Sequence, residues 1–376
     1  MIYLDHNATT PVLPEVILAM QQTWERAFGN PGSRHAAGRK ARQVLDDARE
    51  RIASLVQASP DEVIFTSGGT ESINLALRSF ARGRTGVAVL PPGEHPATDE
   101  TVRSLAGQGI EPWRLTLNTA GQLVPSSLDD VPWDRALFGT ALLAHNETGV
   151  VQELAPLLEA CQHAGIPSHV DAVQAVGKIP VAFHDLGCTT MSLAAHKFGG
   201  PRGIGALLVR SKARLTSQLT GGHQERELRP GTEPVALAVG MATALEICVR
   251  NHEVRSRHCE SLRDLLQIGL LQQAGPAIVN GAGAPRLPNT LNIAFPGCQA
   301  DALLVALDLA NICCSLGSAC ASGSTQPSPI LVAMGCPEDV LASSLRLSLG
   351  PQNTRDEILQ AIDQIARIVT QLRARR

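Results

Sequence analysis

Short apolar segments alternate with longer amphipathic segments along the first two thirds of this chain. The short segments that we interpret as buried strands are 62–66, 86–90, 136–144, 168–171, 190–194 and 205–209. Helical patterns at 71–82 and 154–164 lie between them. Strands that alternate with helices predict a mostly parallel sheet covered on both faces, so we expect an α/β fold.

The pattern changes after about residue 250. The helices predicted there are 253–271, 301–309 and 354–376, and the strands are 289–295 and 345–349. A mixture of this kind is typical of an α+β domain. A chain of 376 residues has room for roughly two domains, so we expect a smaller C-terminal domain packed on the first.

The charge and the apolar pattern exclude several classes of protein. The formal net charge is −3, from 32 basic and 35 acidic residues, which gives no electrostatic reason to bind nucleic acid or an anionic membrane. No apolar run approaches membrane-spanning length, and the start, MIYLDHNATTP, has no secretory pattern. We therefore expect a cytoplasmic protein.

The nine cysteines have no disulfide-like spacing, which predicts reduced thiols. Cys313, Cys314, Cys320 and Cys336 lie fairly near one another in sequence, which raises a metal or iron–sulfur site as an alternative. Their spacing matches no common ligand pattern, so we expect no metal site.

Residues 66–72 (TSGGTES) follow one predicted strand and open a predicted helix. Their glycines allow backbone N–H groups to approach an anion, and a helix N-terminus favours negative charge. Ser and Thr are also common helix caps, so the segment alone fits a cap and a phosphate site equally well. It lacks the Gly-x-Gly-x-x-Gly spacing of a dinucleotide fold.

Two charged residues follow other predicted strands. Asp171 ends the strand at 168–171, where α/β folds place ligands, and it fits either a partner for a protonated ring nitrogen or a helix N-cap. Lys197 comes after an apolar strand and before a glycine-rich turn. Most lysines lie at the surface, but a lysine in such a place can have a depressed pKa and act as an amine nucleophile.

Residues 172–178 (AVQAVGK) end like a nucleotide P-loop. The first position is Ala rather than Gly, and Ile179 stands where a P-loop has its hydroxyl residue. This segment therefore argues against an NTPase.

Pyridoxal 5′-phosphate (PLP) needs a phosphate cradle, a lysine for a Schiff base and a carboxylate for its pyridinium nitrogen. Residues 66–72, Lys197 and Asp171 supply one part each. Three weak motifs that satisfy one cofactor carry more weight together than apart, so we expect a PLP enzyme.

One cysteine stands in a segment of loop composition. Residues 315–328 (SLGSACASGSTQPS) combine small polar residues, glycines and a proline, and they contain Cys320. A structural cysteine prefers an apolar setting. We therefore expect a weakly ordered loop that carries a reactive thiol. Nothing next to Cys320 is cationic, so its activation would come from the site itself.

These segments belong to a longer series of motifs in a fixed order. The series is YLDHNATTP (3–11), FGNP (28–31), TSGGTES (66–72), EH (94–95), NETG (146–149), HVDAVQ (169–174), HK (196–197), GGHQER (221–226), RPGT (229–232), GSAC (317–320) and SLRLSLG (344–350). Over essentially the whole chain it resembles the cysteine desulfurases of the nitrogen-fixation and iron–sulfur-cluster branch. These are class V aminotransferase-like, fold-type I PLP enzymes.

The resemblance implies a fold. It implies a large PLP-binding domain at 14–252 with a mostly parallel, seven-stranded sheet. It also implies a smaller α+β domain, formed by 1–13 and 253–376, that carries the cysteine loop.

The resemblance also implies residue roles. Lys197 would hold the cofactor and move the substrate Cα proton, and Asp171 would pair with the pyridinium nitrogen. The other contacts would be His95 on the ring face, Gln174 and Asn146 at the phenolic oxygen, Gly69, Thr70 and His196 at the phosphate, Thr232 at the phosphate of a neighbouring subunit in a homodimer, and Arg346, Asn30 and Asn146 at the substrate. In isolation, Arg346 fits a surface ion pair, Asn30 a turn, and His95 a core histidine.

Three positions depart from the family pattern. Ala194 stands where a serine is usual, which would remove one hydroxyl from the phosphate site unless Ser192 or a water replaced it. His145 replaces a common asparagine, and Leu316 replaces a common serine in the cysteine loop. None of these changes removes a residue that the chemistry requires.

The implied activity is conversion of L-cysteine to L-alanine, with the sulfur taken as a persulfide by Cys320. It would then pass to an acceptor protein, such as an iron–sulfur scaffold or a sulfur carrier. The alternatives are a selenocysteine lyase, another class V aminotransferase or lyase that does not use Cys320, and a catalytically silent scaffold for assembly partners.

Overall fold

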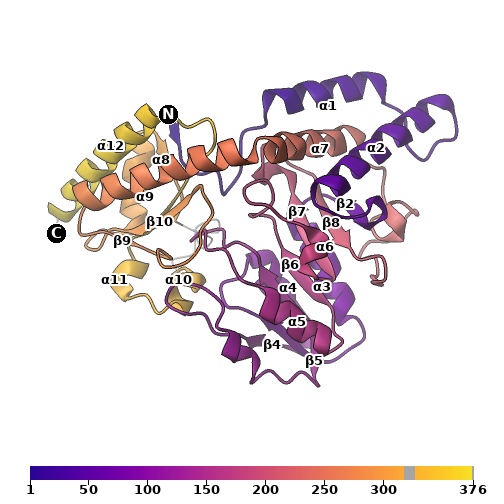
Figure 1. Ribbon diagram of the computed structural model, residues 1–376, viewed down its shortest axis with the longest axis horizontal. Coiled ribbons are helices and arrows are strands. Elements are labelled where there is room, and N and C mark those ends of the chain that lie inside the picture. Colours follow the sequence, from indigo (N-terminus) through magenta and orange to yellow (C-terminus); the bar gives the residue numbers. More distant parts are fainter. Residues whose placement is uncertain (317–326, 375–376) are drawn as a thin grey trace.

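The computed structural model describes residues 1–316 and 327–374. A seven-stranded sheet with the order β2–β8–β7–β6–β5–β3–β4 forms the centre of its larger part (Figure 1). These strands are β2 Val63–Thr66, β3 Gly86–Leu90, β4 Ile110–Arg114, β5 Ala136–Leu142, β6 Ser168–Asp171, β7 Thr190–Ala194 and β8 Gly205–Val209. Neighbours from β7 to β4 are parallel, and only β8 runs antiparallel to its neighbours. The expected α/β fold with a mostly parallel sheet is confirmed.

Helices cover this sheet. They are α1 Pro14–Arg26, α2 Ala36–Leu55, α3 Gly69–Ala81, α4 Pro96–Leu105, α5 Ala155–His163, α6 Phe183–Leu186 and α7 Val235–Arg250. Helix α7 lies between the sheet and the pair α1 and α2 (Figure 1), which explains its almost entirely apolar sequence. A Cβ at Gly240 would come 2.7 Å from Met20 Sδ, so the glycine allows α1 to approach α7 closely.

The remaining elements form a second group (Figure 1). Its helices are α8 His252–Gln273, α9 Ala300–Leu309, α10 Pro329–Ala333, α11 Glu338–Leu341 and α12 Arg355–Ala374. Its strands are β9 Ile278–Val279, β10 Thr290–Ala294 and β12 Ser344–Ser348, which form an antiparallel sheet, together with the parallel pair β1 Ile2–Tyr3 and β11 Ile312–Cys313. Within residues 1–316 and 327–374, none of the helices combines the length and apolarity needed to span a bilayer.

The first residues of the chain pack with its last third. Ile2 and Leu4 share an apolar cluster with Leu291 and Ile362, whereas Ile330 of α10 joins the core of the larger part. We keep 14–252 as a proposed large domain, with 1–13 and 253–376 as the proposed small one. The N-terminal segment that follows β1 thereby reaches the carboxyl edge of the large sheet.

Candidate active site

The carboxyl ends of three parallel strands lie level. Leu142 of β5 pairs with Asp171 of β6, and Asp171 pairs with Ser192 of β7. A cleft of about 450 Å³ opens beyond this edge. The predicted site residues that line it are His95, Asn146, Asp171, Gln174, Lys197 and Arg346. Sequence positions more than 250 residues apart thus meet in one cleft, at the place where α/β folds bind ligands.

Lys197 lies in a 3₁₀ turn, Ala195–Lys197, directly after β7. Its Nζ donates to the backbone oxygens of Asn7 at 2.6 Å and Ala8 at 2.8 Å. Burial, helped by the positive charge of Arg346, lowers the pKa of Lys197 to about 8. A substantial fraction of this amine is therefore neutral near physiological pH, as a nucleophilic lysine requires.

Asp171 is buried at the end of β6. Its Oδ1 accepts hydrogen bonds from the backbone N–H of Val173 at 3.0 Å and from Ser192 Oγ at 3.1 Å. The local turn at 172–174 and the neighbouring strand β7 therefore fix the orientation of this carboxylate. The hydrogen bond from Val173 N–H is of the kind that a helix N-cap accepts, but the Asp171 side chain also lines the cleft.

His95 precedes α4, and its Nδ1 accepts from the backbone N–H of Ala97 at 3.0 Å. Burial lowers the pKa of His95, although the nearby Asp171 opposes this shift. A neutral ring with Nδ1 as the acceptor carries its proton on Nε2. That N–H is a donor for atoms bound in the cleft.

Asn7 connects several of these groups. Its backbone oxygen accepts from Lys197 Nζ and, at 2.8 Å, from Gln174 Nε2. Its side-chain Nδ2 donates to the backbone oxygen of Asn146 at 3.1 Å and to Thr290 Oγ1 at 2.9 Å. Sequence analysis assigned Asn7 no role, although it lies inside the YLDHNATTP motif, because only the fold brings this N-terminal segment to the cleft.

Arg346 reaches the cleft from β12. Its guanidinium donates to Asp5 Oδ1 at 2.8 Å and to the backbone oxygen of Asn146 at 3.2 Å. Its Nε is buried and has no acceptor within the described parts of the chain. Arg346 is therefore a buried cation with unused donor capacity, and the surface ion pair that its sequence position also fitted is excluded.

Residues 66–72 run from the end of β2 into the start of α3. Gly69 is its first residue, and a Cβ there would come 2.8 Å from Val173 Cγ2. The first backbone N–H groups of α3 consequently lie close to the turn that follows Asp171, as a cradle for an anion requires. Thr70 is the second residue of the helix and is exposed.

His196 precedes Lys197 and lies beside the N-terminal segment. Its Nδ1 is 3.1 Å from Thr9 Oγ1, and its backbone oxygen accepts from Thr10 Oγ1 at 2.8 Å. Burial, together with the charge of Lys197, lowers the pKa of His196 to about 4. Without a bound anion, the ring is therefore neutral near pH 7.

Five predicted residues within the described parts of the chain do not line the cleft: Gly69, Thr70, His196, Thr232 and Asn30. Thr232 is exposed in the segment after the 3₁₀ turn Glu225–Glu227, so its predicted contact with a neighbouring subunit stays a prediction. Asn30 is exposed in a turn, where its Oδ1 accepts from the backbone N–H of Gly32 at 2.8 Å. Its role toward the substrate likewise stays a prediction. Cys320 lies outside the described residues.

Another cysteine does reach the cleft. Cys314, Ser315 and Leu316 line it, directly before the part of the chain that is not described. Burial raises the pKa of Cys314 to about 12, so its thiol is protonated and unreactive at neutral pH. Among residues 1–316 and 327–374, no three His, Cys, Asp or Glu side chains are grouped as a metal ion requires.

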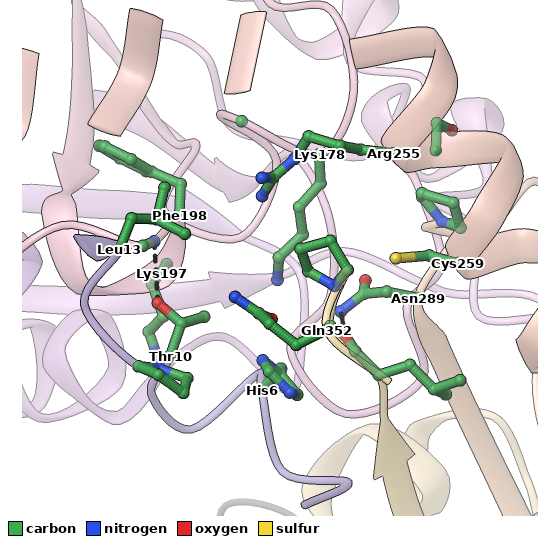
Figure 2. Close-up of a pocket in the computed structure, with 18 of the residues that line it drawn as sticks. His6, Thr10, Leu13, Lys178, Lys197, Phe198, Arg255, Cys259, Asn289 and Gln352 are labelled. Atoms are coloured by element: carbon green, nitrogen blue, oxygen red, sulfur yellow. Dashed lines mark hydrogen bonds between the residues drawn. The ribbon is translucent and has the colours of Figure 1, made fainter. Parts of the chain in front are cut away.

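A smaller cavity of about 50 Å³ adjoins the cleft, and Lys197 lines both. Figure 2 shows that Lys178, His6 and Arg255 surround it, from three separate segments of the chain. Lys178 lines this cavity but not the cleft. Its Nζ donates to the Oε1 atom of Gln174, a residue that does line the cleft, at 2.5 Å. Sequence analysis examined Lys178 only as part of a rejected P-loop.

The chain matches known proteins over nearly its full length. The model of the class-V aminotransferase family matches residues 2–360. An IscS-like cysteine desulfurase of Mycobacterium tuberculosis is 40% identical over 383 residues, covering 99% of this chain and 97% of that protein. Cysteine desulfurase IscS of Klebsiella pneumoniae is 39% identical over 380 residues, covering 99% and 93%.

Solved structures agree with the sequence comparisons. A NifS-like protein superposes with a TM-score of 0.91 at 32% identity, covering 99% of this chain and all of the other. The chain is thus related to NifS-like proteins and cysteine desulfurases over its whole length. It also has a seven-stranded sheet, with an aspartate at the end of β6 and a lysine after β7. The chain belongs to the class-V aminotransferase family of PLP-dependent enzymes, among relatives of the IscS and NifS type.

Proposed function

We propose that this chain is a PLP-dependent cysteine desulfurase. It takes L-cysteine, releases L-alanine and hands the sulfur to an acceptor through a persulfide on Cys320. The observation that carries the proposal is the meeting of Lys197, Asp171 and His95 in one cleft. The whole-length relation to cysteine desulfurases supports it independently.

The cleft residues fit PLP. The close approach of Gly69 to Val173 supports a phosphate position at the start of α3. Asp171, held through Oδ1, suits a protonated ring nitrogen. Lys197 has the lowered pKa that attachment to an aldehyde needs. We assign the phosphate to Gly69, Thr70 and His196, and the ring to Asp171, Gln174, Asn146 and His95.

PLP, when bound, withdraws electrons from the substrate Cα and so makes the bonds to its neighbours easier to break. Lys197 holds the cofactor and then, as a free amine, takes and returns the Cα proton. Arg346 binds the substrate carboxylate with its buried donors, and in doing so it shares or exchanges its ion pair with Asp5. Asn30 is assigned to the same end of the substrate.

The sulfur step involves two bonds. The Cys320 thiolate attacks the substrate sulfur, so that an S–S bond forms while the substrate Cβ–S bond breaks. The Cβ then gains a proton and becomes the methyl group of alanine. The neutral His95, with its proton on Nε2, is the donor that we place nearest to these atoms.

The partners follow from the same proposal. Exposure of Thr232, outside the cleft of its own chain, supports a homodimer in which it serves the phosphate of the other subunit. A sulfur-accepting protein, such as an iron–sulfur scaffold or a sulfur carrier, takes the persulfide. Cys161, Cys188, Cys248 and Cys259 are free thiols, which supports a reducing compartment, the cytoplasm.

Replacing the proposed nucleophile tests the function. Purified protein, loaded with PLP, is expected to release alanine from L-cysteine. Cys320→Ala is expected to lose this activity by at least about a hundredfold while it keeps the visible absorption of bound PLP. The measurement is alanine formation together with the absorption spectrum.

Cys314→Ala is the matched control. Its thiol lines the cleft but is protonated at neutral pH, so this variant should retain desulfurase activity. Full activity in Cys320→Ala would overturn the nucleophile. Activity on selenocysteine or with a keto-acid acceptor, without activity on cysteine, would favour the selenocysteine lyase or another class V enzyme instead.

A further inference from the structure

We propose that Lys178 is a positioning residue that holds the side-chain amides of Asn7 and Gln174 in one orientation and so turns a Gln174 N–H toward bound PLP. This inference rests on the proposed function, because it concerns how the chain presents Gln174 to the cofactor. Lys178 itself does not line the cleft.

The side-chain amine of Lys178 contacts two side-chain amides. Its Nζ donates to Gln174 Oε1 at 2.5 Å and to Asn7 Oδ1 at 2.9 Å. Gln174 and Lys178 lie in two consecutive turns, at 172–176 and 175–179, which bring their side chains together. Within residues 1–316 and 327–374, no carboxylate forms an ion pair with Lys178.

An amine that donates to a side-chain amide selects its oxygen, because the NH₂ group of the amide offers no acceptor. With both oxygens turned to Lys178, the NH₂ groups of Asn7 and Gln174 point the other way. Asn289 Nδ2 also donates to Asn7 Oδ1, at 3.1 Å, and Asn7 Nδ2 donates to Asn146 O and Thr290 Oγ1. Two donors thus hold the Asn7 oxygen, whereas within residues 1–316 and 327–374 Lys178 Nζ is the donor to Gln174 Oε1. Gln174 Nε2 donates one hydrogen to Asn7 O, and its second hydrogen is the donor that the phenolic oxygen of PLP would accept.

Lys197 makes this selection necessary. Its Nζ shares the acceptor Asn7 O with Gln174 Nε2, at 2.6 Å and 2.8 Å. A Gln174 released from Lys178 has an alternative arrangement, in which its oxygen accepts from Lys197. That arrangement would occupy the amine and would turn an acceptor, rather than a donor, toward the phenolic oxygen.

The groups around Lys178 make the position sensitive to charge. Lys197 and Arg346 are the cations that act on it. Its other titratable neighbours include His6, His196 and the thiols of Cys248 and Cys259 on α7 and α8. Burial, added to by Lys197 and Arg346, lowers the pKa of Lys178 well below that of a free lysine. The charges that act on the Lys197 amine are those of Arg346, Asp171 and Asp5.

The first experiment uses the apoprotein and needs no cofactor. Crystal structures of wild type and Lys178→Met are compared. Methionine keeps the length of the side chain but offers no donor. We expect the Gln174 side chain to leave its single wild-type position, with its oxygen turned to Lys197. An unchanged and equally ordered Gln174 in Lys178→Met would overturn the proposal.

The second experiment uses the holoenzyme. The visible absorption of lysine-bound PLP changes with pH as the linkage to Lys197 loses its proton. A weaker donor at the phenolic oxygen makes this proton harder to remove. Lys178→Met should therefore raise the pH midpoint, by on the order of one unit. An unchanged or lowered midpoint would contradict the assignment.

Two controls separate positioning from charge alone. Arg255→Met removes a cation from the same small cavity, and Arg255 donates to neither amide in the described parts of the chain, so its midpoint should move by less than about 0.3 unit. In a Gln174→Met background, Lys178→Met should add little further shift. Equal shifts in Lys178→Met and Arg255→Met, or additive shifts, would show a simple field effect and overturn the positioning role.

The outcome stays separable from that of the proposed function. If the wild-type protein bound no PLP, the proposed function would be wrong, and the second experiment could not be carried out. The apoprotein structures would still decide whether Lys178 holds the two amides. If PLP binds and the wild-type protein is active while Gln174 is unmoved in Lys178→Met, only the role of Lys178 fails.

Discussion

Ala194 illustrates what a single residue changes at this cleft. It ends β7, and its Cβ lies 3.9 Å from the position of a Cβ at Gly69, so the methyl group faces the start of α3. The hydroxyl of Ser192 does not replace the missing one, because it donates to Asp171 Oδ1. The proposed phosphate cradle therefore depends more on the helix N-terminus than it would with a serine at 194.

Ala194→Ser is expected to tighten PLP binding. A hydrogen bond to a charged oxygen contributes roughly 1.5–3 kcal/mol, which corresponds to about a tenfold or larger fall in the dissociation constant. Titration of the apoprotein with PLP, followed by absorption, measures this. Pyridoxal, which has no phosphate, is the matched control and should bind both proteins equally. Equal tightening for both ligands would mean that residue 194 does not face the phosphate.

At the scale of elements, the strands that the sequence predicted best are those that are buried at every position. The strands at 86–90, 168–171, 190–194 and 205–209 have the expected bounds. The expected strand at 136–144 ends at Leu142, where the chain leaves the sheet. Edge strand β4 was missed, because its exposed positions make Ile110–Arg114 (IEPWR) largely polar. Helix α7 has no clear apolar stripe, because it is buried on several sides.

The start of α3 is fixed by the element that faces it. A Cβ at Gly205, the first residue of β8, would come 2.5 Å from Leu193 O and 2.7 Å from the Cα of Gly68. Both neighbours are backbone atoms, which cannot rotate away. The glycine at this strand end therefore allows β7, β8 and the loop before α3 to meet.

Gly205→Ala is expected to destabilise the protein by about 1–3 kcal/mol and to weaken PLP binding, because the loop before α3 must shift. Gly107→Ala is the control: a Cβ there has open space, and a change within about 0.5 kcal/mol is expected. Urea unfolding of the two apoproteins makes the comparison. Equal unfolding midpoints for Gly205→Ala and wild type would show that the backbone adapts without cost.

At the scale of the whole molecule, the candidate site could be predicted in part. Lys197, Asp171 and His95 stand next to strands and helices with recognisable motifs, and all three line the cleft. Asn7 and Lys178 could not be assigned, because neither has a local signal of function. Their roles come from the N-terminal segment, which crosses from β1 to the large sheet and contacts Lys178, Gln174 and Lys197.

The stability of the whole chain depends on a histidine in the middle of its sheet. His169 of β6 is fully buried, and its Nδ1 lies 2.9 Å from Thr190 Oγ1 on β7. Its Nε2 has no partner within residues 1–316 and 327–374. Burial lowers the pKa of His169 to about 3 from the ordinary histidine value of 6.5, so between these pH values the unfolded chain binds a proton that the folded chain does not.

Because the unfolded state binds the extra proton, the stabilisation is complete above about pH 6.5 and is lost as the pH falls toward 3. One proton corresponds to about 1.4 kcal/mol per pH unit, so wild type should lose about 2 kcal/mol more than His169→Gln between pH 6 and pH 4.5. Urea unfolding of both apoproteins across this range measures the difference. Glu94, whose pKa burial raises, has the opposite pH dependence, but it is present in both proteins and cancels. Above pH 7.5 the two curves should run parallel, whereas equal slopes below pH 6 would mean that His169 is protonated within the fold.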